Sequence, residues 1–209
     1  PRIALQMSLY ERVILPWVID KACGSKGFGK QRARLFAAHP VHGIVLEIGF
    51  GSGTNLPYLP ADIDHYLAVD PATSAQKYAN KRLAKHPVNL EYVGLDGQSI
   101  DVDDASIDFV VSTMSLCTIP DPVAALHEAR RILKPGGSLV FLEHGLSPVP
   151  KIANRQERLN GLQNRLFGGC NLNRPIFDLM RDAQALSTTI ELELAWEFAP
   201  EDEFGFADL

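Results

Sequence analysis

Short apolar runs alternate with amphipathic stretches through the middle of the chain. The runs that predict strands lie at 44–48, 66–70, 90–93, 106–112 and 138–142. Between the later runs, residues 73–86 and 123–133 carry apolar side chains at helical spacing. Because parallel strands need a crossover to return to the same edge of a sheet, strands that alternate with helices indicate a parallel sheet. The pattern therefore predicts an α/β fold.

The first forty residues predict a helical cap. A helix is expected over 9–22, interrupted near Pro16 because proline lacks a backbone donor. Three glycines within 24–29 predict a break before a short helix over 30–38.

The last third of the chain predicts two more helices and the edge of the sheet. The helices are expected over 152–167 and 176–186. Over 190–198 apolar residues alternate with glutamates, as in a strand with one buried face, and 204–206 is expected to form a hairpin with it. Together the elements predict a Rossmann-like, doubly wound, mainly parallel seven-stranded sheet with an antiparallel C-terminal edge strand and an N-terminal helical cap.

Size and charge narrow the functional classes. With 209 residues, of which 46% are hydrophobic, the chain can bury one sizeable core as a single domain. The net charge of −5 argues against a nucleic-acid partner, because such proteins neutralise phosphates with a basic face. A small-molecule ligand is expected instead.

The three cysteines, Cys23, Cys117 and Cys170, are widely spaced and form no C-x-x-C pair. This spacing indicates neither a disulfide framework nor a zinc or other metal site, and we expect a reducing, cytoplasmic environment. The apolar run at 13–19 is too short to span a bilayer. A weak contact of this run with a membrane surface stays an alternative.

The first strand leads into a turn that contains Gly49, Gly51 and Gly53, preceded by Glu47, and the second strand ends on Asp70. Glycines let the backbone approach a ligand, and an acidic residue at the next strand end can accept hydrogen bonds from ribose hydroxyls. The spacing differs from the G-x-G-x-x-G pattern of NAD-binding proteins. A carboxylate here would repel a pyrophosphate but suits the ammonium and sulfonium groups of S-adenosylmethionine (SAM).

These motifs occur in a fixed order with Asp96-Gly97, the strand at 106–111 and the Leu-Lys-Pro-Gly-Gly segment at 133–137. From about 43 to 142 the sequence closely resembles the class I SAM-dependent methyltransferases that act on small molecules. The segments at 116–119, 141–144 and 167–172 are similar to the methyltransferase-like thiol S-methyltransferase group and its bacterial relatives. The sequence departs from that group because it shows no long hydrophobic N-terminal anchor, so we do not expect membrane residence.

The resemblance implies a cap at 1–40, a SAM-binding core at 43–145 and an acceptor-pocket insertion at 146–175. It places Glu47 at the methionine end of SAM, Asp70 at the ribose and Asp96 at the adenine, and the order of the motifs favours this role of Asp96 over that of a turn residue before glycine. The cofactor-binding set that it implies is Glu47, Gly49, Gly51, Gly53, Asn55, Asp70, Pro71, Asp96, Gly97, Ser112 and Met114.

Methyl transfer from a sulfonium mainly requires that the acceptor be held in line and water excluded, so a strong base is not obligatory. A thiol sulfur is the first choice of acceptor, because a thiol is partly ionised near neutral pH. An amine or phospholipid head group, a quinone-like ring methylated at carbon or oxygen, and a SAM-binding regulator without turnover remain alternatives. The oligomeric state is left open.

His144 is the candidate catalytic residue, because it follows the strand at 138–142 at the carboxyl edge of the sheet. A histidine that is merely hydrogen-bonded in a loop is an equal alternative. Glu143 is expected to pair with an arginine of the following helix, and Cys117 and Cys170 to act as small apolar side chains. The acceptor-binding set that we expect is Tyr10, Trp17, His144 and Phe167.

Overall fold

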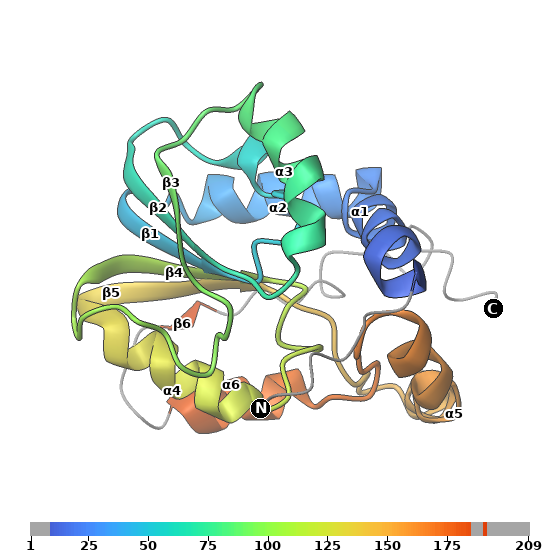
Figure 1. Ribbon diagram of the computed structural model, residues 1–209. Helices are drawn as coiled ribbons and strands as arrows, with labels where there is room; N and C mark the ends of the chain where they lie inside the picture. Colours follow the sequence, from blue (N-terminus) through green and yellow to red (C-terminus); the bar gives the residue numbers. More distant parts are fainter. Residues whose placement is uncertain (1–8, 185–189, 192–209) are drawn as a thin grey trace, which may run out of the picture.

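The computed structural model describes residues 9–184 and 190–191, and these residues form an α/β fold (Figure 1). The helices are a π-helix at Tyr10–Ile14, α1 at Leu15–Cys23, α2 at Lys26–Ala38, α3 at Gln76–Leu83, α4 at Pro122–Ile132, α5 at Pro150–Leu166 and α6 at Ile176–Gln184, with 3-10 turns at Leu56–Tyr58 and Thr73–Ala75. The strands are β1 at Gly43–Ile48, β2 at Ile63–Val69, β3 at Leu90–Gly94, β4 at Ile107–Thr113, β5 at Leu133–Leu142 and β6 at Ile190–Glu191.

The strands lie in the order β3-β2-β1-β4-β5-β6, and every described pair is parallel. The chain moves outward from β1 to β3 and then returns to place β4 on the other side of β1. Helices α2 and α3 cover one face of the sheet, and α4 and α6 cover the other (Figure 1). Ligands of open parallel sheets bind at such a reversal, beyond the carboxyl ends of the strands. The predicted Rossmann-like parallel architecture is confirmed.

The predicted seven-stranded sheet is wrong for the described residues, which form six strands. The edge strand expected over 190–198 is described only at Ile190–Glu191, where it pairs with β5 in parallel. The hairpin expected at 204–206, and with it the antiparallel edge strand, lies outside the described residues. Strand β5 also begins earlier than predicted, because Leu133 already pairs with Ile107 of β4.

The N-terminal helices differ in detail from the prediction. The interruption near Pro16 is a change from a π-helix to α1, and Pro16 occupies the first turn of α1, where its missing N–H is tolerated. The glycine-rich break is shorter than expected, because α2 begins at Lys26 and continues through Gly29. A Cβ at Gly29 would lie 2.5 Å from the Tyr58 hydroxyl, so close packing explains this glycine.

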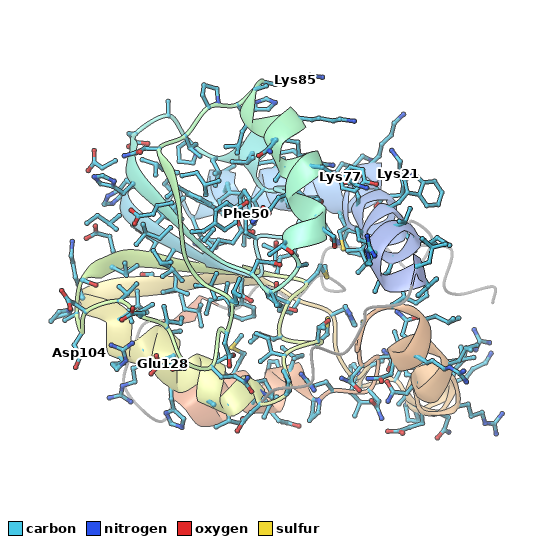
Figure 2. All side chains as sticks on the ribbon, in the orientation of Figure 1. Lys21, Phe50, Lys77, Lys85, Asp104 and Glu128 are labelled. Atoms are coloured by element: carbon cyan, nitrogen blue, oxygen red, sulfur yellow. The ribbon has the colours of Figure 1, made fainter. Side chains whose placement is uncertain are left out.

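Two apolar clusters fill the layers on either side of the sheet. One joins β1, β4 and β5 to α4 and α6, and the other joins the opposite face to α2 and α3. Phe50, which is 2% exposed, lies inside the second cluster, whereas Lys77 and Lys85 point outward (Figure 2). The core thus holds the sheet rigidly, and the strand ends are fixed points from which a site can be built. Within the described residues, no helix has the length and apolarity that crossing a membrane requires.

Candidate functional site

Most of the predicted site residues lie beyond the carboxyl ends of β1, β2, β4 and β5, on the side of the sheet where α1 and α5 are found (Figure 1). The two helical segments meet there. The Tyr10 hydroxyl donates a hydrogen bond to the Leu166 carbonyl, and a Cβ at Gly168 would lie 3.2 Å from the Leu15 side chain. The N-terminal cap and the insertion after β5 therefore flank one shared region.

The glycine turn after β1 is shaped around Asp70. Gly49, Gly51 and Gly53 have φ values of +82°, +53° and +72°, which side chains rarely adopt. The Gly51 N–H donates to Asp70 Oδ2 at 2.7 Å, and the Ala72 N–H donates to Oδ1 at 2.5 Å. Burial raises the pKa of Asp70, and these two bonds oppose that rise.

A side chain at Gly51 would not clash with this carboxylate. A Cβ built there would lie 3.9 Å from Asp70 Oδ2 and from the Gly49 carbonyl oxygen, an ordinary contact distance. A carboxylate beside a glycine turn can accept from the hydroxyls of a ribose. The residues present therefore fit the nucleoside part of SAM.

Glu47 lies deeper than the turn and is 1% exposed. Its Oε1 accepts from Asn55 Nδ2 at 2.7 Å, and its Oε2 accepts from the Tyr66 hydroxyl at 2.6 Å. Burial raises the pKa of Glu47 to about 8. Both oxygens thus have partners within the protein, and the contacts of Glu47 and Asn55 with the methionine end of SAM stay predictions.

Arg32 completes this buried network and was missed from the sequence. Its side chain is 1% exposed, its Nε donates to Asn55 Oδ1 at 2.8 Å, and its Nη1 donates to the Cys23 carbonyl at 2.6 Å. Burial lowers the pKa of this guanidinium. A signal was present, since Arg32 is three residues before the apolar Leu35 and therefore shares its buried helix face.

Asp96 lies on the surface in a turn. It accepts from the backbone N–H of Gln98 at 2.9 Å and from Gln98 Nε2 at 2.8 Å, and these bonds lower its pKa. Gly97 is packed tightly, because a Cβ there would lie 2.8 Å from Ile48 Cγ2. Asp96 thus makes the bonds of a turn residue, and its contact with adenine, like that of the exposed Pro71 with the cofactor, stays a prediction.

The end of β4 is held to the end of β5 by Glu143. Its Oε1 accepts from Ser112 Oγ at 2.8 Å and from the backbone N–H groups of Ser115 and Leu116 at 2.9 and 3.1 Å. The predicted pairing of Glu143 with an arginine is therefore wrong. Burial raises its pKa, and its Oε2 has no hydrogen-bond partner among the described residues.

Met114 follows β4 with a φ of +56°, in the left-handed region that costs a side chain energy. Its backbone N–H donates to the Leu142 carbonyl at 2.9 Å, so the pairing with β5 holds this conformation. Met114, which is predicted to form the floor of the cofactor pocket with Ser112, thus lies in a strained turn directly after β4.

The side chains of two cysteines and one histidine meet beyond the carboxyl ends of β4 and β5. The Sγ atoms of Cys117 and Cys170 and a ring nitrogen of His144 all lie within 4.8 Å of one another, and His144 Nε2 is 3.2 Å from Cys170 Sγ. Hydrogen bonds from Cys117 and then His144 lower the pKa of Cys170 to about 4, against the effect of burial. Burial alone would lower the pKa of His144, but Cys170 raises it.

The sequence indicates no metal site and small apolar roles for Cys117 and Cys170, whereas the structure groups both with His144 in a cluster of candidate metal ligands. Sequence spacing could not reveal it, because the residues are brought together by the ends of two strands and the loop after α5. A partial signal existed, since Cys117 and His144 each follow a predicted strand at the same edge of the sheet.

The other expected acceptor-binding residues lie around this region. Tyr10 and Phe167 are half-buried, and Trp17 on α1 is 52% exposed. Their contact with an acceptor stays a prediction. A separate hollow of about 520 Å³ lies near the amino ends of the strands, between Ile44, Glu91 and Arg131, and includes none of the predicted site residues.

Comparison with known proteins agrees with this geometry. The family described as "Methyltransferase domain" matches residues 46–141. The chain is 31% identical over 160 residues to thiol S-methyltransferase TMT1B of Rattus norvegicus, covering 75% of this chain and 64% of that protein. It is 29% identical over 170 residues to thiol S-methyltransferase TMT1A of Homo sapiens, covering 78% of this chain and 69% of that protein. The chain thus spans about two thirds of the length of these relatives.

Solved structures support the same fold. A SAM-dependent methyltransferase from Thermotoga maritima superposes with a TM-score of 0.60 at 22% identity, covering 83% of this chain and 78% of that chain. The glycine turn, the buried Asp70 and the strained turn at Met114 occupy the strand ends where such a sheet binds its ligand. Residues 46–141 thus match the methyltransferase domain family, and the sheet has the fold of the SAM-dependent methyltransferases.

Proposed function

We propose that the protein transfers the methyl group of SAM to the sulfur of a small, apolar thiol. The observation that carries the proposal is the similarity to two thiol S-methyltransferases over about three quarters of the chain. The histidine and cysteines grouped at the ends of β4 and β5 add a site at which a thiol can be bound and lose its proton.

The cofactor side is formed by the strand ends of β1 and β2. Asp70 accepts from the ribose hydroxyls, and the glycine turn lets the backbone pass close to the ligand. Ser112 and Met114 form the floor of the pocket, while Glu47 and Asn55 order the methionine end. SAM supplies an activated methyl group on a sulfonium sulfur, so the protein has to hold and orient the acceptor and to exclude water.

The acceptor side is formed by the ends of β4 and β5 together with the cap and the insertion. His144 binds or deprotonates the thiol, and Tyr10, Trp17 and Phe167 enclose its apolar part. The contacts between Tyr10 and Leu166 support closure of the cap over the insertion. Closure of this kind removes water from the reacting atoms.

The proposal is tested with purified protein, labelled SAM and a panel of small thiols, amines, phospholipid head groups, phenols and quinols. Methyl transfer to thiols above the other acceptors is expected. Preferred transfer to nitrogen, carbon or oxygen would overturn the thiol assignment. Calorimetry with S-adenosylhomocysteine and NAD accompanies the panel, with binding expected only for the first. Binding without turnover on any acceptor would indicate a SAM-binding regulator.

A further inference from the structure

We infer that Cys117, His144 and Cys170 bind one zinc ion, with a fourth position left open for the sulfur of the acceptor. The ion would bind to two thiolates and one imidazole, a ligand set that zinc uses in catalytic sites. The zinc site itself stands on the geometry of the three side chains. Its role in holding the acceptor rests on the proposed thiol methylation.

The distances between the ligand atoms suit a tetrahedral ion. Zinc lies about 2.3 Å from sulfur and about 2.0–2.1 Å from nitrogen, so tetrahedral ligand atoms are about 3.5–3.8 Å apart. The three ligand atoms here lie within 4.8 Å of one another, and His144 Nε2 is 3.2 Å from Cys170 Sγ. Rotamer adjustments of less than about 1 Å bring the three atoms to zinc geometry.

The backbone that carries two of the ligands is fixed before any ion binds. Glu143 immediately precedes His144, and its Oε1 accepts from the backbone N–H groups of Ser115 and Leu116. These residues belong to the short loop that carries Cys117. A single buried carboxylate thus ties the Cys117 loop to the strand end that carries His144.

The third ligand is tied to the first by Asn171. Its backbone N–H and its Nδ2 both donate to the Cys117 carbonyl, at 3.0 and 2.9 Å. Asn164 Nδ2 donates to the carbonyl of Gly169, next to Cys170, at 2.9 Å. Three segments that are far apart in the sequence are therefore joined at the ligands, which lowers the entropy cost of assembling the site.

Polar side chains that are not ligands themselves lie close to both cysteine sulfurs, as in metal-bound thiolate sites. Gln163 Nε2 lies 3.7 Å from Cys170 Sγ, and Thr118 Oγ1 lies 3.5 Å from Cys117 Sγ. Donors of this kind orient ligands and balance their charge in metal sites. Cys117 and Cys170 are 2% and 9% exposed, so water has little access to the two sulfurs.

The ion gives the acceptor thiol a way to lose its proton. The thiol binds as a thiolate at the fourth position and its proton passes to solvent. When the new sulfur–carbon bond forms and the carbon–sulfur bond of the sulfonium breaks, the electron pair of that bond stays on S-adenosylhomocysteine. The product is a neutral thioether, which is a weaker zinc ligand than a thiolate and leaves the site.

The experiment measures metal directly, without an acceptor. Full-length protein prepared with reductant and zinc, then desalted, is expected to hold about one zinc ion per chain by elemental analysis. Replacement by Co²⁺ should give an intense thiolate-to-cobalt charge-transfer band. Cys117→Ser, Cys170→Ser and His144→Ala should each lose zinc and weaken the band. No stoichiometric zinc, zinc that persists in all three variants, or a Cys117–Cys170 disulfide in the reduced preparation would overturn the site.

Matched controls separate ligand loss from general damage. Cys23→Ser changes the one cysteine outside the cluster, and His127→Ala changes an exposed histidine on α4. Both should retain zinc and the charge-transfer band. S-adenosylhomocysteine binding by calorimetry checks that each variant is folded.

Activity then separates the zinc site from the proposed function. Wild-type protein that binds zinc but methylates no thiol would leave the site intact and overturn the acceptor assignment. Zinc-free protein that methylates thiols at the full rate would leave the acceptor assignment intact and overturn the role of zinc in holding the acceptor. Loss of thiol methylation on chelation, with recovery when zinc is returned, is the expected result.

Discussion

The two halves of the strand edge use polar groups in different ways. At the carboxyl ends of β1 and β2, Glu47 and Asp70 have hydrogen-bond partners on both oxygens. Asn55, Tyr66 and the backbone supply these partners. Beyond β4 and β5, Glu143 keeps one oxygen without a described partner. Among the residues that the structure describes, the cysteines and the histidine contact one another there and make weak hydrogen bonds to or from sulfur.

The difference shows how one sheet edge can combine rigid binding with reactivity. Two hydrogen bonds on each carboxylate fix the geometry of the cofactor half, where Arg32 Nη2 is the group without a described partner. Thiols and an imidazole with weak contacts keep bonding capacity for an ion or an acceptor. The cofactor half is therefore expected to respond to substitution in affinity or stability, and the acceptor half in turnover.

The largest expected effect is on turnover in the acceptor half. His144→Ala should lower the rate of thiol methylation by ~10²–10⁴-fold and leave S-adenosylhomocysteine affinity nearly unchanged. If His144 only takes a proton, raising the pH above the thiol's pKa should restore much of the rate, because a thiolate needs no base. If His144 binds zinc, the loss should persist.

His144→Cys sharpens this test. Cysteine keeps a zinc ligand at the same position but removes the imidazole. The zinc site predicts that His144→Cys retains metal and more activity than His144→Ala. An equal loss of activity in both variants, with a metal content unchanged from wild type, would assign His144 to proton transfer. Full activity in both variants would make His144 a structural residue.

In the cofactor half, the prediction concerns affinity. Asp70→Ala should weaken S-adenosylhomocysteine binding by about 1.5–3 kcal/mol, because a charge-assisted acceptor for the ribose is lost. Asp70→Asn keeps the shape and one acceptor and should lose less. Calorimetry measures both, and the exposed Glu91→Gln on β3 serves as a control. Unchanged affinity in Asp70→Ala would contradict the ribose assignment.

The signals of the cofactor half are local, because a glycine turn after an apolar run and an acid at the next strand end depend on neighbours in the chain. The structure places Asp70 beside that turn, where it accepts from the Gly51 N–H, and its contact with the ribose stays a prediction. The parallel order of β1 to β5 follows equally from alternating strands and helices.

The acceptor half was predicted less completely, because its residues meet only through tertiary structure. Cys170 reaches His144 by way of the loop after α5, and Glu143 turns inward to the β4 loop rather than outward to a helix arginine. The spacing from Leu35 places Arg32 on a buried helix face, but its acceptor on Asn55 lies 23 residues away. No local spacing encodes such a contact between two side chains.

A separate effect is expected in how stability depends on pH. Burial raises the pKa of Glu47 from 4.5 to about 8, so between these values the folded protein keeps a proton that the unfolded chain has lost. This contribution to stability is complete below about pH 4.5 and disappears as pH rises through about 8. Denaturant unfolding of Glu47→Gln across this range should therefore show a shallower fall in stability than wild type, and an identical slope would place the charged form of Glu47 in the folded protein.

The smallest expected effects come from the two ends of β4, where Ala105 and Met114 have φ values of +51° and +56°. A residue with a side chain loses about 1–2 kcal/mol of folding free energy in the left-handed conformation. Glycine avoids this loss but costs about 0.5–1 kcal/mol, because it makes the unfolded chain more flexible. Glycine at an exposed left-handed position should therefore be neutral or stabilising by up to about 1 kcal/mol. Ala105→Gly, at the amino end and exposed, should show that change with S-adenosylhomocysteine binding unaltered. Met114→Gly also removes a side chain that packs against the core, so it should gain no stability and should weaken binding. Thermal unfolding measures the stability of both variants, and calorimetry measures their S-adenosylhomocysteine affinity. Equal losses of this affinity in Ala105→Gly and Met114→Gly would show that the carboxyl end of β4 is not the cofactor side.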